Sequence, residues 1–117
     1  MAPPERERSP LAHMRRGLIE FCVLTLLSGR DRYAVELVQV LARHDLIAGE
    51  GTIYPLLSRL RKQGLVTTAW QESQTGPPRR YYGLTSDGVG ALARFSSDWA
   101  ALSGSVDEII RGKGDIA

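Results

Sequence analysis

Apolar residues recur at helical spacing in the first part of the chain and predict two helices. Over residues 11–28 they return every three or four positions, and Gly29 then supplies a stop signal. Asp31 is a candidate N-cap for a second helix that ends near His44. The wide apolar face of the first helix indicates a core element. The defining apolar positions are Leu18, Ile19, Cys22, Val23, Leu26 and Leu27, and then Ala34, Leu37, Val38 and Leu41.

A third helix is predicted to start near Gly51. Pro55 lacks a backbone N–H, so it fits only at or near the first turn of a helix. Gly64 followed by Leu65 is typical of a helix end closed by a glycine and an apolar contact. The second and third helices therefore form a helix-turn-helix pair. The apolar face of the third helix contains Ile53, Leu56, Leu57 and Leu60.

The period changes after this helix and predicts a β-hairpin. Residues 66–70 are rich in β-branched side chains, and residues 79–84 form a second short strand candidate. Residues 71–78 between them consist of polar, Gly and Pro residues, which are typical of turns. A hairpin directly behind a helix-turn-helix pair is the wing of a winged helix.

A long helix with a heptad seam is predicted for the end of the chain. Thr85 is its candidate N-cap, and the helix runs over residues 86–111. At 1.5 Å per residue it would be roughly 39 Å long, too long to be covered by so small a body. We expect the seam to pack on a second copy of the chain, and the alternative is that it folds back onto its own domain. Residues 103–105 leave room for a kink. The predicted dimerisation residues are Leu92, Phe95, Trp99, Leu102, Val106 and Ile109.

Length and composition fit one small globular domain. The chain has 117 residues, of which 43% are hydrophobic and 24% charged. The predicted fold is mostly α with a small β-hairpin: a winged helix-turn-helix followed by a C-terminal dimerisation helix. We expect a flexible N-terminal arm over residues 1–10, a DNA-binding domain over residues 11–84, and the dimerisation helix with its tail over residues 85–117.

No segment of the sequence predicts a membrane span or a secretion signal. The apolar runs are shorter than the roughly 20 residues that cross a bilayer, and the charged N-terminus leads into Pro and Glu. We therefore expect a cytoplasmic protein with no membrane partner. The single cysteine, Cys22, excludes an intrachain disulfide and a cysteine-based zinc cluster. Its apolar neighbours favour a buried structural thiol over a redox sensor.

The sequence also lacks the residue patterns of an enzyme. His13 and His44 are isolated, no Ser/His/Asp pattern stands out, and no glycine-rich loop could cradle a phosphate. We therefore predict no catalytic activity and no cofactor.

The polar face of the third helix suits DNA. Arg can bond guanine through two donors, Lys neutralises phosphate, and a helix N-terminus attracts anions. The alternative is an ordinary solvated face, but the position of this helix between a turn and a wing favours recognition. Arg79 and Arg80 beside the wing turn could reach the phosphate backbone or serve only as solubilising surface. The net charge of +2 permits DNA binding without requiring it. The candidates on the third helix are Thr52, Tyr54, Pro55, Ser58, Arg59 and Lys62.

With these segments placed, the chain resembles the PadR family of bacterial transcriptional regulators, particularly its short members with one C-terminal helix. The resemblance lies in LIEFCVLTLLSGRDRYAVEL, GTIYPLLSRLRKQGLV and GPPRRYYGLTSDG. It implies a dimeric winged-helix protein that represses genes and is released from operator DNA by a small molecule or stress signal. By this resemblance Tyr33 joins the DNA-reading residues of the third helix, while Arg79 and Arg80 fall on the wing strand. The family's Tyr-Gly-Tyr is replaced here by Tyr33-Ala34-Val35.

The resemblance also implies a site for an effector. In multidrug-binding members a tryptophan on the last helix lies at the dimer centre and stacks on planar aromatic compounds. Trp99 is placed similarly, with Phe21 and Glu20 as candidate walls of the pocket. The alternative is that Trp99 only packs in the seam.

The predicted function is thus a dimeric repressor that binds an inverted-repeat operator, with two third helices in major grooves about 34 Å apart. Two other functions stay open, since a fold does not fix a function. One is a winged helix that binds protein, and the other is a ligand sensor without operator binding.

Overall fold

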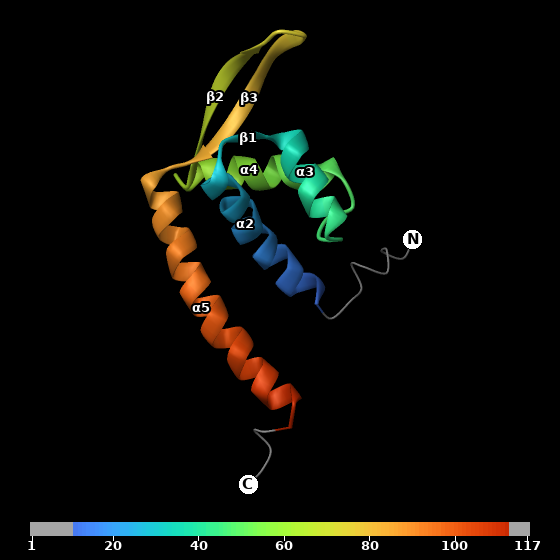
Figure 1. Ribbon diagram of the computed structural model, residues 1–117, viewed down its shortest axis with the longest axis vertical. Helices are drawn as coiled ribbons and strands as arrows, with labels where there is room; N and C mark the ends of the chain where they lie inside the picture. The colour runs from blue at the N-terminus through green and yellow to red at the C-terminus, as the bar shows by residue number, and fades with distance from the viewer. Residues whose placement is uncertain (1–10, 113–117) are drawn as a thin grey trace.

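The computed structural model describes residues 11–112, and within them it is mostly helical with one small antiparallel sheet (Figure 1). This architecture confirms the predicted winged helix-turn-helix fold class. The predicted arm over residues 1–10 and the tail beyond residue 112 lie outside the described residues. The helices are α2 (Ala12–Gly29), α3 (Ala34–Arg43), the 3₁₀ turn η1 (Glu50–Thr52), α4 (Ile53–Lys62) and α5 (Ser86–Ile110), and the strands are β1 (Arg32–Tyr33), β2 (Val66–Ser73) and β3 (Gly76–Leu84).

One hydrophobic core joins α2, α3 and α4. Leu24, Leu37 and Leu57, one from each helix, have no exposed surface. Burying a side chain of this size stabilises the fold by about 1.5–3 kcal/mol. Val66 and Tyr82 extend the core to the root of the hairpin, so the wing is anchored in the same core as the helices.

Both helices of the helix-turn-helix pair end in the same hydrogen-bonded motif. At the end of α4, the N–H of Leu65 donates to the carbonyl of Leu60 over 3.0 Å, and Gly64 adopts a φ of 76°. This is the glycine-capped end that the sequence predicts. At the end of α3 the N–H of Leu46 donates to the carbonyl of Leu41, but there the left-handed residue is Asp45, with a φ of 59°.

The predicted start of the second helix is wrong by about two residues. Asp31 does not cap it: α3 begins at Ala34, and the N–H of the preceding Tyr33 donates to the Glu36 carboxylate over 3.2 Å. The residues before the helix are instead drawn into β1, which pairs with β3. Asp31 lies against Gly83, where a Cβ atom would come within 2.5 Å of its carboxylate, so a larger residue there would require the Asp31 side chain to move.

The hairpin is longer than the sequence predicts. Its strands extend through most of the expected loop over residues 71–78, and an irregularity in register separates Gln71 from Ser73. Pro77 and Pro78 are accommodated in β3 near the tip. The sheet order is β1-β3-β2, so β2 is an edge strand along its length. Figure 1 shows the hairpin reaching well beyond the helical body.

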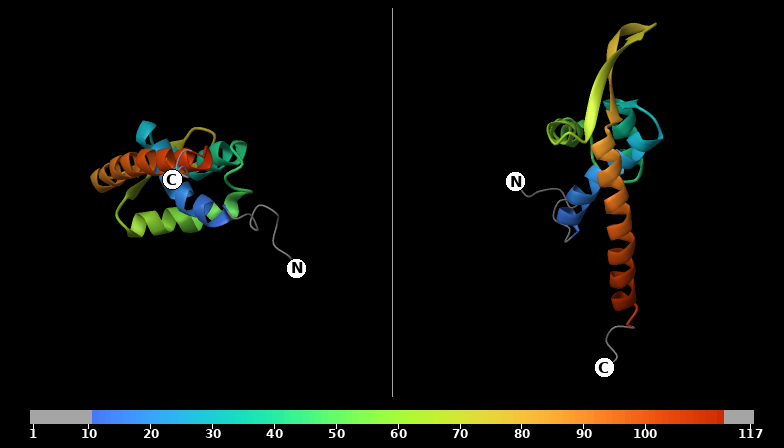
Figure 2. Two further views of the ribbon diagram at one scale, coloured as in Figure 1. Left: turned by 90° about the horizontal axis from the view of Figure 1, so that it is seen from below. Right: turned by 90° about the vertical axis from the view of Figure 1, so that its left-hand side faces the viewer.

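The final helix extends away from the body on the side opposite to the hairpin (Figures 1 and 2). Thr85 caps it as predicted, because its Oγ1 accepts from the N–H of Gly88 over 3.0 Å. The helix is continuous through residues 103–105, where the sequence had allowed for a kink. Its first half packs on α2, where Leu92 and Phe95 are half-buried, whereas Leu102 and Ile109 are 58% and 66% exposed.

Candidate nucleic-acid interface

Helix α4 turns its apolar residues inward and its polar candidates outward. Tyr54, Pro55, Ser58, Arg59 and Lys62 are all exposed, opposite the buried leucine face. At 100° per residue these side chains fan out over two flanks of the helix. The flank that contains Tyr54 faces the wing, and the flank that contains Pro55 and Arg59 faces α2.

An open groove of about 720 Å³, hereafter the wing groove, joins α4 to the hairpin. Tyr54 comes to it from α4, Tyr33 from β1, and Arg79 and Arg80 from β3. Four predicted DNA-binding residues from three segments are thereby brought to one surface. The full lining is Tyr33, Ala34, Val35, Tyr54, Trp70, Arg79, Arg80 and Tyr82.

Aromatic rings hold both wing arginines in place. The guanidinium of Arg79 lies 4.8 Å from the ring centre of Tyr33, and that of Arg80 lies 5.0 Å from the ring centre of Trp70. Tyr33 in turn makes an edge contact with Tyr81 at 5.4 Å. A ring stabilises a cation and restricts its motion without neutralising it. Both charges therefore stay available to an anionic partner.

Trp70 and Arg61 are further candidates, which the sequence pattern alone did not single out. Trp70 is 65% exposed and faces Arg80 directly across the hairpin. The signal was present, since period-2 alternation along residues 66–70 places Trp70 and Arg80 on one face once the register is known. Arg61 is exposed at the end of α4, one residue before Lys62.

Arg59 is placed differently from the other cations. Its Nε and Nη2 both donate to Oε1 of Glu20 on α2, over 2.9 Å and 2.5 Å. The Arg59 side chain is 54% exposed and that of Glu20 is 24% exposed. An ion pair across two helices thus lies at the margin of the predicted recognition surface.

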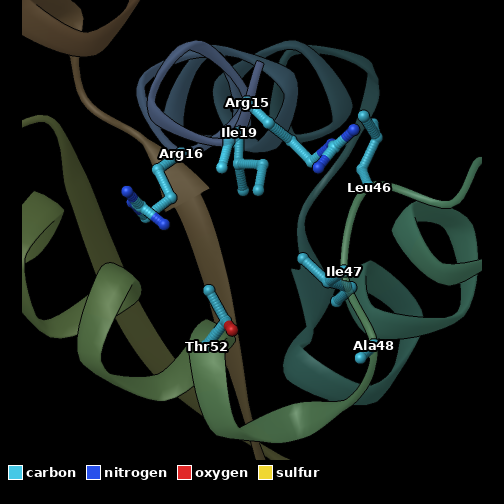
Figure 3. Close-up of a pocket in the computed structure, with 8 residues that line it drawn as sticks. Arg15, Arg16, Ile19, Leu46, Ile47, Ala48 and Thr52 are labelled. Carbon is cyan, nitrogen blue, oxygen red and sulfur yellow. The ribbon is translucent and has the colours of Figure 1, made fainter. Parts of the chain in front are cut away.

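Thr52 precedes α4 and lines a small cavity of about 120 Å³ beneath α2 (Figure 3). Figure 3 shows Arg16 on the same side of the cavity as Thr52, while Arg15 extends toward Leu46. The guanidinium of Arg16 lies 3.0 Å from Nδ1 of His13. These arginines add positive charge near the N-terminus of α4, and a helix N-terminus already favours anions.

A second groove, of about 350 Å³ and almost wholly apolar, runs between α2 and α5. It is hereafter the aromatic groove. The rings of Phe21 and Phe95 stack with centres 3.8 Å apart, and the ring of Trp99 continues the stack at 6.2 Å from Phe95. Phe21 and Trp99 therefore meet in one groove, as the effector hypothesis requires. Glu20 does not line it, because its carboxylate is bound to Arg59.

The single cysteine lies away from both grooves, on α2. Burial raises the pKa of the Cys22 thiol, which keeps it protonated. Among the described residues, no three His, Cys, Asp or Glu side chains are grouped to bind a metal. None of the described helices is both long and apolar enough to cross a bilayer.

The chain is similar to known proteins in both sequence and fold. Residues 23–94 match the model of the Transcriptional regulator PadR-like family. A PadR-like transcription factor structure from Bacteroides fragilis is 41% identical, with a TM-score of 0.71 over 84% of this chain and 95% of that one. A PadR-like transcriptional regulator structure from Bacillus cereus is 34% identical, with a TM-score of 0.77 over 84% and 96%. A transcriptional regulator of Mycobacterium tuberculosis is 29% identical over 92% of this chain and 96% of its own length.

Proposed function

The chain belongs to the PadR-like family of transcriptional regulators, DNA-binding proteins and not enzymes, and on this premise we propose a homodimeric repressor that a small molecule releases from an inverted-repeat operator. The observation that carries the proposal is the wing groove, where the exposed flank of α4 and two ring-supported arginines border one surface. A positive, partly aromatic surface beside a helix N-terminus suits a DNA backbone and the edges of its bases.

In this proposal α4 enters the major groove and the wing contacts phosphates beside it. The long hairpin supports that role, because its tip lies far from the core and would reach along the duplex. Tyr33 acts through Arg79, which its ring holds. The residues proposed to contact DNA are Thr52, Tyr54, Pro55, Ser58, Arg59, Lys62, Arg79 and Arg80, with Tyr33 supporting the wing.

The second half of α5 supports the proposal of a dimer. Leu102, Val106 and Ile109 are exposed and lie on one side of the helix, which is costly for a lone chain. A second copy would cover them through the same seam. The first half of the seam already has a partner in its own chain, since Phe95 stacks on Phe21. We therefore propose residues 11–84 as the DNA-binding unit and the helix after it as the dimerisation unit.

The aromatic groove is the proposed effector site. A planar apolar molecule would extend the stack of Phe21, Phe95 and Trp99, where nearly all the lining is apolar. The start of α5 is tied to the end of α4, because Thr85 Oγ1 donates to the Gly64 carbonyl over 2.6 Å. A ligand that changes the α2 and α5 packing would thus alter the placement of α4 in the dimer.

The salt dependence of duplex binding tests DNA recognition. The slope of log K against log salt should be strongly negative, and removing two phosphate contacts with Arg79→Gln and Arg80→Gln should make it shallower by about 2. The matched control is Arg94→Gln with Arg111→Gln, which removes equal charge from α5 and from the residue that caps its end. Affinity that does not fall with salt would contradict the proposal and favour a winged helix that binds protein.

A further inference from the structure

The ion pair between Glu20 and Arg59 occupies one edge of a guanidinium on the recognition helix. Two of its donors, Nε and Nη2, share a single carboxylate oxygen. The pair is contributed by positions 39 residues apart and joins the middle of α2 to the last turn of α4. It fixes the direction of the Arg59 side chain, because a guanidinium held along one side keeps its end facing outward.

Glu20 also offsets the charge of Arg59, whereas the charges of the two wing arginines are not offset. Arg79 and Arg80 rest on aromatic rings, which leave their charge intact. The Glu20 carboxylate is mostly covered, whereas Arg59 is more than half exposed. An approaching phosphate would therefore meet a cation whose charge is already balanced, and it would gain less from Arg59 than from an unpaired arginine.

We propose that Glu20 is a positioning residue for DNA recognition, which orients Arg59 and limits its attraction to phosphates in general. This inference rests on the proposed DNA-binding function. The consequence is that the protein distinguishes its operator from other DNA. A guanidinium with an offset charge and a fixed orientation adds little to the binding of arbitrary DNA, but it contributes fully where a base edge or phosphate meets its outward end. Glu20 thus serves recognition of DNA sequence, not the effector pocket for which its sequence position made it a candidate.

The experiment compares Glu20→Gln with the parent protein on two duplexes of equal length. One is selected from a random pool by the parent protein, and the other has an unrelated sequence. Glutamine keeps the shape of the side chain and an oxygen acceptor but removes the charge. For the unrelated duplex we expect about fivefold tighter binding at low salt and a salt slope steeper by about 1, the value for one added phosphate contact. The selected duplex should gain less, so the affinity ratio falls.

Two controls separate this role from a general change of charge or stability. Glu108→Gln removes the same charge from the far half of α5 and should leave both affinities near those of the parent. In an Arg59→Ala background, Glu20→Gln should no longer change the ratio of the two affinities, because the guanidinium that Glu20 orients is gone. Removing the bare carboxylate should then tighten binding of both duplexes alike. Glu20→Asp, which withdraws the carboxylate by one methylene, should give intermediate values and serves if the glutamine variant does not fold.

The outcomes are distinct. If the parent binds the selected duplex but Glu20→Gln matches Glu108→Gln, or if Glu20→Gln still changes the affinity ratio without Arg59, the positioning role is wrong while the proposed function stands. If the parent binds no duplex with salt-dependent affinity, the proposed function fails and this inference fails with it.

Discussion

Single residues fix the ends of the helices that carry the candidate interface. Gly64 and Asp45 occupy equivalent left-handed positions after α4 and α3, with φ values of 76° and 59°. Glycine adopts this conformation without a steric cost, whereas a residue with a Cβ atom is strained by about 1 kcal/mol. One helix end is therefore relaxed, and the other carries strain that its hydrogen bonds offset.

Opposite substitutions at these two sites should have opposite effects on stability. Gly64→Ala should lower the free energy of unfolding by about 1 kcal/mol, although no atom lies within 4 Å of its Cβ position, because the cost is conformational. Asp45→Gly should raise it by a few tenths to about 1 kcal/mol. Chemical denaturation measures both. If both substitutions lowered the free energy of unfolding equally, the Asp45 side chain would stabilise the fold by more than its left-handed backbone destabilises it.

Glu36 ties β1 to the start of α3 and should make this junction sensitive to acid. Burial alone would raise the pKa of its carboxyl, but hydrogen bonds from Arg30 and from the N–H of Tyr33 outweigh it and lower the pKa. The stabilisation is therefore present at neutral pH and is lost as pH falls through the lowered pKa. We expect Glu36→Gln to cost about 0.5–1.5 kcal/mol at pH 7. In denaturation curves the two proteins should become equally stable once the pH is below the lowered pKa of Glu36, and a constant difference would contradict this account.

Among the secondary structure elements, those with a strong hydrophobic period were predicted correctly from the sequence. The three core helices and the glycine-capped end of α4 follow from 3.6-residue spacing and local turn chemistry. The two-residue strand β1 has no period to detect, and it forms only because β3 offers it a free edge. The hairpin outgrew its predicted loop because backbone pairing, absent from composition, outweighed turn propensity at residues 71–78.

The candidate interface was predictable only as a set of residue types. Tertiary structure decides their partners: Arg59 is bound by Glu20 from a helix 39 residues away, and Arg80 by Trp70 through strand register. Helical spacing predicted that the α5 residues share one stripe. It could not show that the stripe divides, with Phe95 on α2 and Leu102 exposed.

The exposed half of α5 should control assembly without controlling the fold of one chain. Leu102→Asp with Val106→Asp should convert the proposed dimer to a monomer, because the charges would meet in a dry seam. Sedimentation should show the change while the helical circular dichroism signal is kept. Ser97→Asp, which adds charge to the opposite side of α5, should leave the dimer intact. A parent protein that is monomeric at micromolar concentration would contradict the proposed dimer directly.

At the scale of the whole molecule, α2 is the element on which both proposed activities converge. One side of it lines the aromatic groove through Phe21, and the other holds Arg59 through Glu20. The neighbouring α5 is joined to the end of α4 by Thr85 and by Gly88, whose missing side chain lets the helix approach the Leu65 carbonyl. Ligand and DNA would therefore act on one connected body, and their affinities should be coupled.

This coupling makes a quantitative prediction. A planar aromatic dye that binds the aromatic groove should weaken duplex binding by some factor, typically about 5- to 150-fold, and saturating duplex should weaken dye binding by the same factor. Dye fluorescence and duplex anisotropy measure the two sides of this equality. Trp99→Ala should lose dye binding and retain duplex binding. If dye still weakens duplex binding by this variant, the dye acts outside the aromatic groove, for example by binding the DNA itself. Dye that binds the parent protein without changing duplex affinity would show that the aromatic groove is not linked to the placement of α4.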